Sequence, residues 1–562
     1  MDASSGERWW RYPVGVHRGY VDGRFGQMHY AIKAPDEPSG AVPLVCFHAS
    51  PLSWRSYSEV LIEMGRDRWV VAIDSPGHGD SDKPPRQPSI EDYGAAVGEV
   101  LDRLGISRCD ALGNHTGSKV AVELALQRPG QVRRLVLISA PVYSADELAA
   151  MKTKYHEVAL REDGGHLAER WRGMMTSVGT ALPLWLTHRY FVETQRGGLE
   201  YEWGHHAAFA YQHADHLPHV KQPVLVLNPQ DEIVAATRRS APLLLNGRLQ
   251  DVPESYDLTH GQVATFGRYA RAFLDGPASD PAVGGQVAKM PPQPSQPRAK
   301  IVRRSYVATT YGQVHLRETT PATISRRPLL CLHASPRSGQ DFDGLLPEIG
   351  KDRVALAPDM PGLGASDIPV SPPEIEDYAV AMIALINRRG ITELDLLGYH
   401  TGCLTAVEIA RREPALVRRI ALISGPLIAD DHLAHLRKNA GPETPRADGD
   451  HVVDRWRKKW PWHGPGQTIA MVDATVAEFF RAGPFAWWAY RALFGYPFAE
   501  RIAAIPHPVL LLNPRDEISE NTRATAKLLR HGRMIELPDL GYGMMDAVPA
   551  RIASYLREHL DA

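Results

Sequence analysis

A five-residue segment that occurs twice places the strongest constraint on how this chain can fold. Gly113-Asn114-His115-Thr116-Gly117 returns as Gly398-Tyr399-His400-Thr401-Gly402, 285 residues later. The same offset relates His48-Ala49-Ser50-Pro51 to His333-Ala334-Ser335-Pro336. An offset that stays constant across loops as well as apolar segments indicates a duplicated domain and excludes a short repeat. We therefore expect one fold, present twice.

A stretch rich in proline and glycine separates the two copies. The chain has 562 residues, which is more than one hydrophobic core usually serves. Residues 277–299 contain many prolines and glycines without hydrophobic periodicity, which is typical of a linker. The sequence therefore predicts a first domain over residues 1–276, a linker over residues 277–299 and a second domain over residues 300–562.

Short apolar runs alternate with helical patterns inside each copy. Residues 42–47, 70–73, 135–139 and 224–227 are brief and rich in β-branched side chains, and the second copy repeats them. Such runs suit buried strands of a parallel sheet. A helical, aromatic segment interrupts the pattern. We predict an α/β fold in which each domain is a doubly wound, mostly parallel sheet with an inserted helical cap, over about residues 142–220 and 427–505.

Composition excludes several classes of protein. The net charge is −2 and no basic block is present, which argues against a nucleic-acid partner or an anionic membrane surface. No uninterrupted apolar stretch is long enough to span a bilayer. Four cysteines without C-x-x-C spacing read as core residues in a reducing compartment, most simply the cytoplasm. No phosphate loop, dinucleotide fingerprint or zinc spacing is found, so we expect neither cofactor nor metal.

Five motifs in a fixed order resemble the α/β-hydrolase family, and the resemblance covers nearly all of both halves. The motifs are a strand that ends in His-Ala-Ser-Pro, the turn from Asp74 to Asp82, the glycine-flanked elbow, a cap, and an acid followed by a histidine. The elbow departs from the family pattern, because histidine stands in both copies where the family has serine. The frame thus predicts a hydrolase fold, with an imidazole at the reacting position.

The resemblance implies a site in each half. In the first domain His115 occupies the nucleophile position, Asp231 the acid position and His260 the histidine position, with the backbone N–H groups of Ser50 and Thr116 as the oxyanion hole. The counterparts in the second domain are His400, Asp516, Tyr542, Ser335 and Thr401. Because Tyr542 replaces the histidine, we expect catalysis in the first domain and a degenerate or divergent second domain.

A histidine on the elbow leaves several mechanisms open. His115 could attack an ester directly, with His260, held in one tautomer by Asp231, activating the water that follows. An imidazole reaches about 2 Å farther than a serine hydroxyl, which favours a non-covalent role. The two histidines could then act as a general base and acid on an ester or lactone, or in a cofactor-independent lyase or isomerase. A metal site made of two histidines and Asp231, and a non-catalytic binding scaffold, are further alternatives.

The cap suggests the substrate. His48, His166, Trp171 and Trp203 are candidate substrate-binding residues, although Asp-Gly before a helix also explains the segment around His166 as a helix cap with a buried tryptophan. The many aromatic residues of the cap suggest that the substrate is an apolar or aromatic molecule of small to medium size. The two halves are expected to pack as an intramolecular pseudo-dimer, with further oligomerisation possible.

Overall fold

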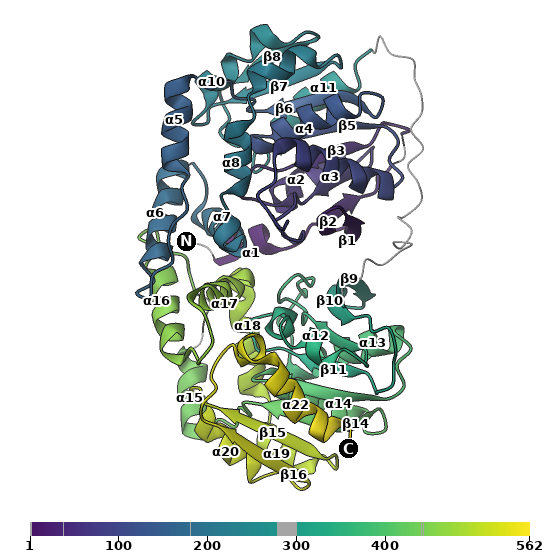
Figure 1. Ribbon diagram of the computed structural model, residues 1–562, viewed down its shortest axis with the longest axis vertical. Helices are drawn as coiled ribbons and strands as arrows, with labels where there is room; N and C mark the ends of the chain where they lie inside the picture. The colour runs from purple at the N-terminus through teal and green to yellow at the C-terminus, as the bar shows by residue number, and fades with distance from the viewer. Residues whose placement is uncertain (1–2, 38, 180, 278–300, 440, 442) are drawn as a thin grey trace.

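Two sheet-containing halves lie one above the other along the longest axis of the molecule (Figure 1). The computed structural model describes residues 3–37, 39–179, 181–277, 301–439, 441 and 443–562. The predicted linker, residues 277–299, lies outside the described residues except for residue 277. We refer to the described residues up to 277 as the first half and to those from 301 as the second half.

The first half contains an eight-stranded sheet in the order β1-β2-β4-β3-β5-β6-β7-β8. Antiparallel pairing is confined to β1 with β2 and β2 with β4, and the remaining neighbours are parallel. The strands are β1 (Val16–Gly23), β2 (Gly26–Lys33), β3 (Leu44–Phe47), β4 (Val70–Ile73), β5 (Cys109–Asn114), β6 (Val132–Ile138), β7 (Val224–Pro229) and β8 (Gly247–Val252).

The second half repeats this sheet with the same strand order and the same mixture of directions. Its strands are β9 (Val302–Thr309), β10 (Gly312–Thr319), β11 (Leu329–Leu332), β12 (Ala355–Pro358), β13 (Leu394–Tyr399), β14 (Val417–Ile423), β15 (Val509–Pro514) and β16 (Gly532–Leu537). The predicted fold class, two tandem and mostly parallel α/β sheets, is confirmed.

Helices cover both faces of each sheet, so its central strands are buried. In the first half one apolar cluster joins the sheet to α3 (Ile90–Arg103) and α4 (Thr116–Gln127). A second cluster joins the opposite face to α2 (Ser58–Met64) and α11 (Val263–Leu274). Strands buried on both faces read as continuous apolar runs, which is why Val70–Ile73 could be predicted to the residue.

The second half has the equivalent covering helices. They are α12 (Leu346–Ile349), α13 (Ile375–Arg388), α14 (Gly402–Arg412), α21 (Met544–Ala547) and α22 (Pro549–Leu560). Two further short helices, α10 (Val234–Arg238) and α20 (Ser519–Ala526), follow the strands that carry the predicted acids.

A helical cap is inserted between the sixth and seventh strands of each sheet. In the first half it comprises α5 (Ala145–Lys154), α6 (Gly165–Val178), α7 (Leu184–Arg196), α8 (Trp203–Ala210) and α9 (His213–His216). In the second half it comprises α15 (Asp430–Asn439), α16 (Asp450–Lys459), α17 (Ile469–Arg481), α18 (Ala486–Gly495) and α19 (Phe498–Ala504).

The two caps meet and share an apolar cluster. Helix α6 contacts α16, and α7 contacts α17, along one side of the molecule (Figure 1). Leu167 and Trp171 of the first half pack with Val452, Trp456 and Val472 of the second. The N-terminal helix α1 (Ala3–Trp10) adds a second cluster of this kind, because Trp10 packs with residues of the second half.

Polar contacts between the halves come in symmetric pairs. The Tyr20 hydroxyl lies 3.0 Å from His315 Nε2, and the Tyr306 hydroxyl lies 3.1 Å from His29 Nε2. In the same way Arg18 pairs with Asp367, and Arg304 pairs with Asp82. Each contact is repeated with the roles of the two halves exchanged, which is the pattern of a two-fold symmetric interface, here within one chain.

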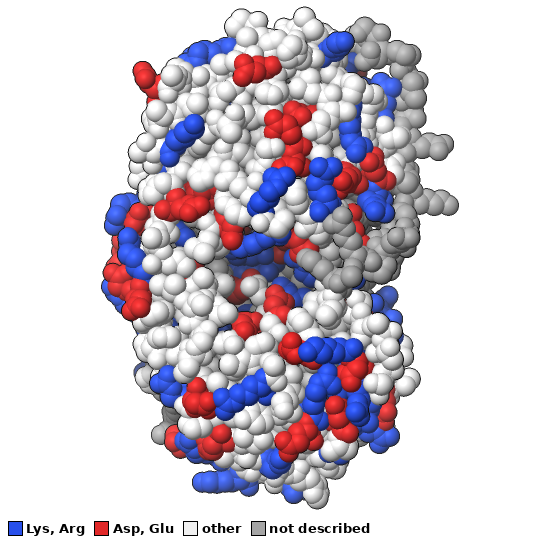
Figure 2. Space-filling model, viewed as in Figure 1, with Lys and Arg blue, Asp and Glu red and all other residues white. Residues whose placement is uncertain are grey.

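Charge is well mixed on the face of the molecule that Figure 2 shows. On the face shown in Figure 2, acidic and basic side chains are interspersed over both halves, in keeping with a net charge of −2. No helix among the described residues is both long enough and apolar enough to cross a membrane.

Candidate active site

The first elbow is a sharp turn between β5 and α4. His115 stands at its apex with φ 50° and ψ −112°, a conformation that non-glycine residues rarely adopt. Two glycines make the turn possible. A Cβ on Gly113 would lie 2.1 Å from the carbonyl oxygen of Gly117, and one on Gly117 would lie 1.8 Å from that of Phe47. The strained turn presents the His115 side chain at the carboxyl end of the sheet.

The second elbow has the same backbone. His400 also has φ 50° and lies between β13 and α14. A Cβ on Gly402 would lie 2.0 Å from the Leu332 carbonyl oxygen. The repeated pattern in the sequence therefore corresponds to the same local geometry in both halves.

Asp231 pairs with the elbow histidine itself. His115 Nε2 lies 3.1 Å from Asp231 Oδ2, and the side chain of Asp231 is buried. Burial lowers the pKa of His115, but the hydrogen bond and the charge of Asp231 outweigh it, so the pKa is raised above 6.5. Burial likewise raises the pKa of Asp231, and the partnership with His115 reverses this effect to give a lowered value. The Asp231 carboxylate thus fixes the orientation of the His115 imidazole and favours its protonated form.

Ser139 and a backbone amide fix the carboxylate. The Ser139 hydroxyl donates to the same oxygen, Asp231 Oδ2, and Ile233 N donates to Oδ1 at 3.0 Å. Ser139 follows β6 with φ 56°, and Ser424 repeats this conformation at φ 58° beside Asp516. Sequence reasoning missed these serines. Their signal was a serine at the end of the same apolar run in both copies.

The other ring nitrogen of His115 is free. Among the described residues His115 Nδ1 has no hydrogen-bond partner, and the side chain is 35% exposed. His115, Asn114 and Asp231 line a cavity of about 390 Å³ beneath the cap. An imidazole whose Nε2–H is held by a carboxylate carries its lone pair on Nδ1, and that atom is therefore a base available to the cavity.

The predicted oxyanion-hole residues also line this cavity. Ser50 and Thr116 are both part of its wall. Within the described part of the chain, the backbone N–H of neither residue is engaged by a protein acceptor. Two unpaired donors beside a base can stabilise an oxyanion that forms on a bound substrate.

His260 occupies a different place from the one expected of it. The sequence predicted that Asp231 would orient His260, but Asp231 is bonded to His115 instead. His260 Nε2 lies 2.9 Å from the Arg189 guanidinium, and His260 Nδ1 lies 3.0 Å from the Tyr190 hydroxyl. Because an arginine can only donate, it occupies the Nε2 lone pair of the imidazole. The expected pairing of two histidines around Asp231 is therefore corrected to one histidine and one aspartate.

Aromatic side chains from the cap region and from the loop after β8 line the cavity, and none of the four predicted residues does. Tyr143, Tyr155, Tyr190, Tyr201, Phe209 and Tyr256 line it. His48 is buried behind the elbow, where its Nδ1 lies 2.9 Å from the Ala49 carbonyl oxygen and its Nε2 accepts from Ser75 N at 2.9 Å. His48 is thus a structural residue that fixes the turn after β3.

The other three candidates also lie away from the cavity. His166 and Trp171 face the second half: His166 Nε2 lies 3.1 Å from Asp473, and the Trp171 indole donates to the Ala447 carbonyl oxygen at 3.0 Å. Trp203 is half-buried at the start of α8 and is not part of the cavity wall. The alternative reading of this segment, a helix cap with a buried tryptophan, agrees with the contacts, because Asp163 accepts from Gly165 N at 2.8 Å and Trp171 is buried.

In the second half a side chain already binds the backbone N–H of Ser335, the counterpart of a predicted oxyanion-hole donor. Ser335 N donates to the Thr401 hydroxyl at 2.6 Å, a hydrogen bond that has no equivalent between Ser50 and Thr116. His400 Nε2 lies 3.3 Å from Asp516 Oδ2 but is not aligned for a hydrogen bond. His400 is only 12% exposed, about a third of the value for His115.

Charged and aromatic side chains occupy the rest of the second site. Arg337 and Asp341 form an ion pair at 2.6 Å, at the positions where the first half has Leu52 and Ser56 on its cavity wall. The Tyr542 ring stacks on His400 with centroids 5.4 Å apart. The ammonium group of Lys459 lies over the Tyr542 ring, 4.5 Å from its centroid. The equivalent of Lys459 in the first half is the cavity residue Met174.

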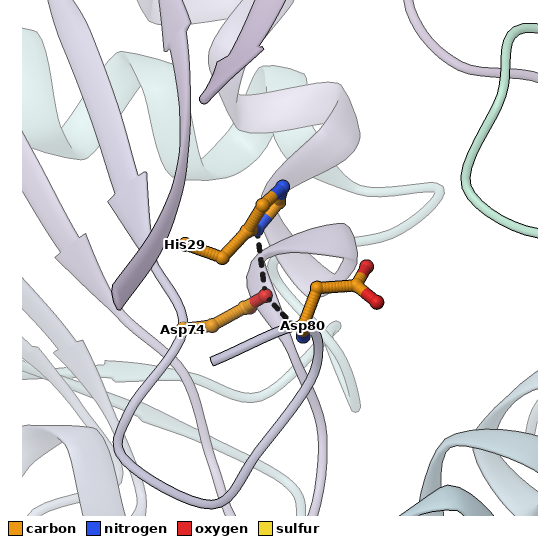
Figure 3. Close-up of side chains that lie close together, drawn as sticks. All are labelled: His29, Asp74 and Asp80. Carbon is orange, nitrogen blue, oxygen red and sulfur yellow. Dashed lines mark hydrogen bonds and ion pairs between the residues drawn. The ribbon is translucent and has the colours of Figure 1, made fainter. Parts of the chain in front are cut away.

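One group of histidine and carboxylates in the described residues has metal-like spacing. Asp74 accepts from His29 Nδ1 at 2.8 Å and from Asp80 N at 2.9 Å (Figure 3). The Asp80 carboxylate points away from Asp74 in Figure 3 and pairs with Arg196 at 2.6 Å and Arg481 at 2.8 Å. The three side chains already have protein partners, so the group stabilises the turn and the contact between the halves.

Comparison with known proteins agrees with the fold. A family model for the α/β-hydrolase fold matches residues 42–159, and a model for the α/β-hydrolase family matches residues 329–555. Together the two matches cover more than half of the chain. The chain belongs to the α/β-hydrolase family and carries the family's domain twice in tandem.

Similar proteins each match less than half of this chain. Non-heme chloroperoxidase from Streptomyces lividans is 28% identical over 255 residues, which are 41% of this chain and 88% of that protein. Epoxide hydrolase 4 from Mus musculus is 32% identical over 100 residues, 17% of this chain, and the match spans only 28% of its length. A solved enol-lactonase from Burkholderia xenovorans LB400 is 19% identical, with a TM-score of 0.37 over 46% of this chain and 99% of that one.

Proposed function

We propose that the protein is a hydrolase of carboxylic esters or lactones, and that the first half carries the activity. The observation that supports this most strongly is the His115–Asp231 pair, with Nε2 held at 3.1 Å and Nδ1 free at the cavity. Membership of the α/β-hydrolase family and hydrolases among the relatives support the reaction class.

The geometry supports a general-base mechanism. His115 Nδ1 removes a proton from a water molecule as the water adds to the carbonyl carbon of the substrate. The tetrahedral oxyanion accepts hydrogen bonds from the N–H groups of Ser50 and Thr116. The proton on His115 then passes to the departing alcohol oxygen, while Asp231 stabilises the imidazolium in between. In this scheme the elbow histidine does the work that a loop histidine does elsewhere in the family's fold.

The cavity suggests which substrates fit. A volume of about 390 Å³ and a wall of tyrosine and phenylalanine side chains suit an apolar or aromatic ester or lactone of small to medium size. Aromatic faces pack against acyl chains and rings, and the phenol hydroxyls leave polar edges for orientation.

The second half is proposed to be inactive in this reaction. Its oxyanion donor Ser335 is occupied by Thr401, and Arg337 and Asp341 replace cavity residues. We propose that the halves form a permanent intramolecular pseudo-dimer in which only the first elbow has access to substrate.

A cofactor-independent lyase or isomerase is the second candidate. The observation in its favour is that the elbow offers a base and two oxyanion donors but no hydroxyl nucleophile. The same groups could remove a proton beside a carbonyl and stabilise the enolate. The form of this hypothesis that uses two facing histidines loses support, because Arg189 occupies His260 Nε2.

A screen with matched variants tests the proposal. p-Nitrophenyl esters of increasing chain length, a lactone panel and enolisable ketones are offered to the full-length protein, to His115→Ala and to His400→Ala. Hydrolysis that depends on His115 and survives His400→Ala supports the proposal. Exchange of a carbon-bound proton for deuterium without hydrolysis, also dependent on His115, would instead favour the lyase or isomerase.

A further inference from the structure

Helix α6 has one face toward the cavity and another toward the second half. Arg170, Gly173, Met174 and Ser177 belong to the cavity wall. Leu167 and Trp171, on the adjoining face, pack in the apolar cluster that the two caps share. The roof of the first-half site therefore rests directly on α16 and α17 of the second half.

A carboxylate from the second half joins this contact. Asp473 of α17 is buried, and its two oxygens bind two residues of α6. Oδ1 lies 3.1 Å from His166 Nε2, and Oδ2 accepts from Arg170 at 3.3 Å. His166 Nδ1 accepts from Arg161 N at 3.1 Å, so the proton of a neutral His166 lies on Nε2 and points to Asp473.

Arg170 is the member of this group that reaches the cavity. Its guanidinium lies 4.8 Å from the ring centroid of the cavity residue Tyr201, and one terminal nitrogen also donates to Gln195 at 2.7 Å. Its Nε is buried and has no hydrogen-bond partner in the described part of the chain. Arg170 lines the cavity and offers five N–H donors, so its guanidinium favours a ligand that carries an oxygen acceptor at this part of the wall.

The contact is not reproduced on the other side of the pseudo-two-fold axis. The position equivalent to Asp473 is His188, which bonds to His451 at 3.1 Å and supplies no negative charge. The equivalent of Arg170 is Arg455, which pairs with Glu443 of its own half. The first half thus receives a carboxylate from its partner, whereas the second half receives an imidazole.

We propose that Asp473 is a positioning residue for the first-half site, and that it fixes Arg170 so that the guanidinium binds an oxygen acceptor of the substrate. The site is then complete only with the second half attached. This inference rests on the proposed cavity site and adds a chemical requirement: a carbonyl, carboxylate or similar oxygen on the part of the substrate that lies under α6. Orientation by a held arginine affects binding of substrate more than the chemical step at His115.

Full-length variants with a matched control test the inference. Asp473→Asn keeps the shape and removes the charge that holds Arg170, and His451→Gln disturbs the sister contact between the same caps without touching Arg170. On p-nitrophenyl butyrate we expect Asp473→Asn to raise KM about tenfold, with kcat within about threefold. His451→Gln should leave KM unchanged. Asp473→Glu should restore part of the loss.

A double variant separates positioning from packing. If Asp473 acts through Arg170, the KM of Asp473→Asn with Arg170→Met should equal that of Arg170→Met alone. Additive effects would overturn the inference. So would an unchanged KM in Asp473→Asn, or an equal KM change in His451→Gln.

A binding probe keeps this test independent of the reaction. 8-Anilinonaphthalene-1-sulfonate has an aromatic body and sulfonate oxygens, and its fluorescence reports binding without turnover. Binding that weakens about tenfold in both Arg170→Met and Asp473→Asn, but not in His451→Gln, supports the inference even if no ester is hydrolysed. Binding that weakens in Arg170→Met but is unchanged in Asp473→Asn, or is unchanged in both, overturns it.

Discussion

The two elbows have nearly the same backbone, and their surroundings make them chemically different. His115 and His400 both stand at φ 50° beside a buried aspartate. Around His115 lies an aromatic cavity, whereas charged side chains and a stacked tyrosine surround His400. Both copies of the duplicated domain therefore have the strained turn. Whether it can act on a substrate depends on residues from other elements.

Small replacements account for the closure of the second site. A threonine hydroxyl accepts from Ser335 N in the second half, and the equivalent hydrogen bond is absent between Thr116 and Ser50. Arg337 with Asp341 replaces a leucine and a serine, and buried charges of this kind are tolerated only as pairs. Burial raises the pKa of Asp341 to about 6 despite Arg337 beside it. The second site has the features of a filled, polar interior.

The largest effect should come from removing each elbow histidine in turn. We expect His115→Ala to lower kcat about 10²- to 10⁴-fold, because the general base is lost. His400→Ala should leave kcat within about twofold, since the His400 side chain is only 12% exposed and the Tyr542 ring stacks on it. Steady-state kinetics on the best ester from the screen measures both, with circular dichroism as the check on folding. Equal losses of kcat in the two variants would contradict the proposed difference between the two elbows.

The variant Asp231→Asn tests the role of the first elbow through the pH dependence of kcat/KM. Hydrolysis needs neutral His115, so kcat/KM should rise with pH around a midpoint above 6.5, where Asp231 holds the pKa of His115. In Asp231→Asn the carboxylate no longer offsets the effect of burial on the pKa of His115, so the midpoint of kcat/KM should move to lower pH while kcat falls about 10²-fold.

The stability of the folded protein should depend on pH in the opposite direction. The contribution of His115 to the free energy of unfolding is complete below pH 6.5 and is lost as pH rises through the raised pKa.

A midpoint that is the same in both proteins would show that His115 is not the group that titrates. The equivalent change in the second half, Asp516→Asn, serves as the control and should leave the profile unchanged.

His260→Ala should have a smaller effect than either change at the dyad. His260 Nε2 accepts from Arg189, and its removal takes the acceptor from that N–H at a cost of about 1–3 kcal/mol, while Tyr190 keeps its hydrogen bond to Asp257. We expect a lower Tm with kcat within about tenfold of the parent. A loss as large as that of His115→Ala would indicate that His260 turns toward Asp231 during catalysis.

The smallest effect concerns stability of the contact between the caps. Burial, then Arg446, lowers the pKa of His451 to about 4, and burial with His451 holds the pKa of His188 well below 6.5. These groups contribute stability above pH 6.5 that is lost as pH falls toward 4, because the unfolded chain takes up protons first. His451→Gln should flatten the fall of Tm over this range. The same slope in both proteins would contradict this assignment.

Much of the fold could be predicted because the duplication tests each pattern twice. Apolar runs such as Val70–Ile73 lie in strands buried on both faces, where sequence and burial coincide. The glycines around His115 were equally informative, since backbone atoms leave no room for a Cβ at Gly117.

The partners of the site residues could not be predicted from their order along the chain. Asp231 binds His115, whereas His260 binds Arg189 and Tyr190 of the inserted helix α7. The order of the residues along the chain did not indicate these partners. His166 looked like a pocket residue because its partner, Asp473, is 307 residues away in the other half. Contacts between inserted caps have no local sequence signal.

In the proposed mechanism His115, held by Asp231, acts as a non-covalent base. The most direct measurement is the mass of the protein quenched during turnover of a p-nitrophenyl ester in ¹⁸O water. We predict an unmodified chain at every time point and one ¹⁸O in the acid released by the first turnover. A chain heavier by the acyl group, with the adduct on the peptide that contains His115 and released at the turnover rate, would contradict the claim.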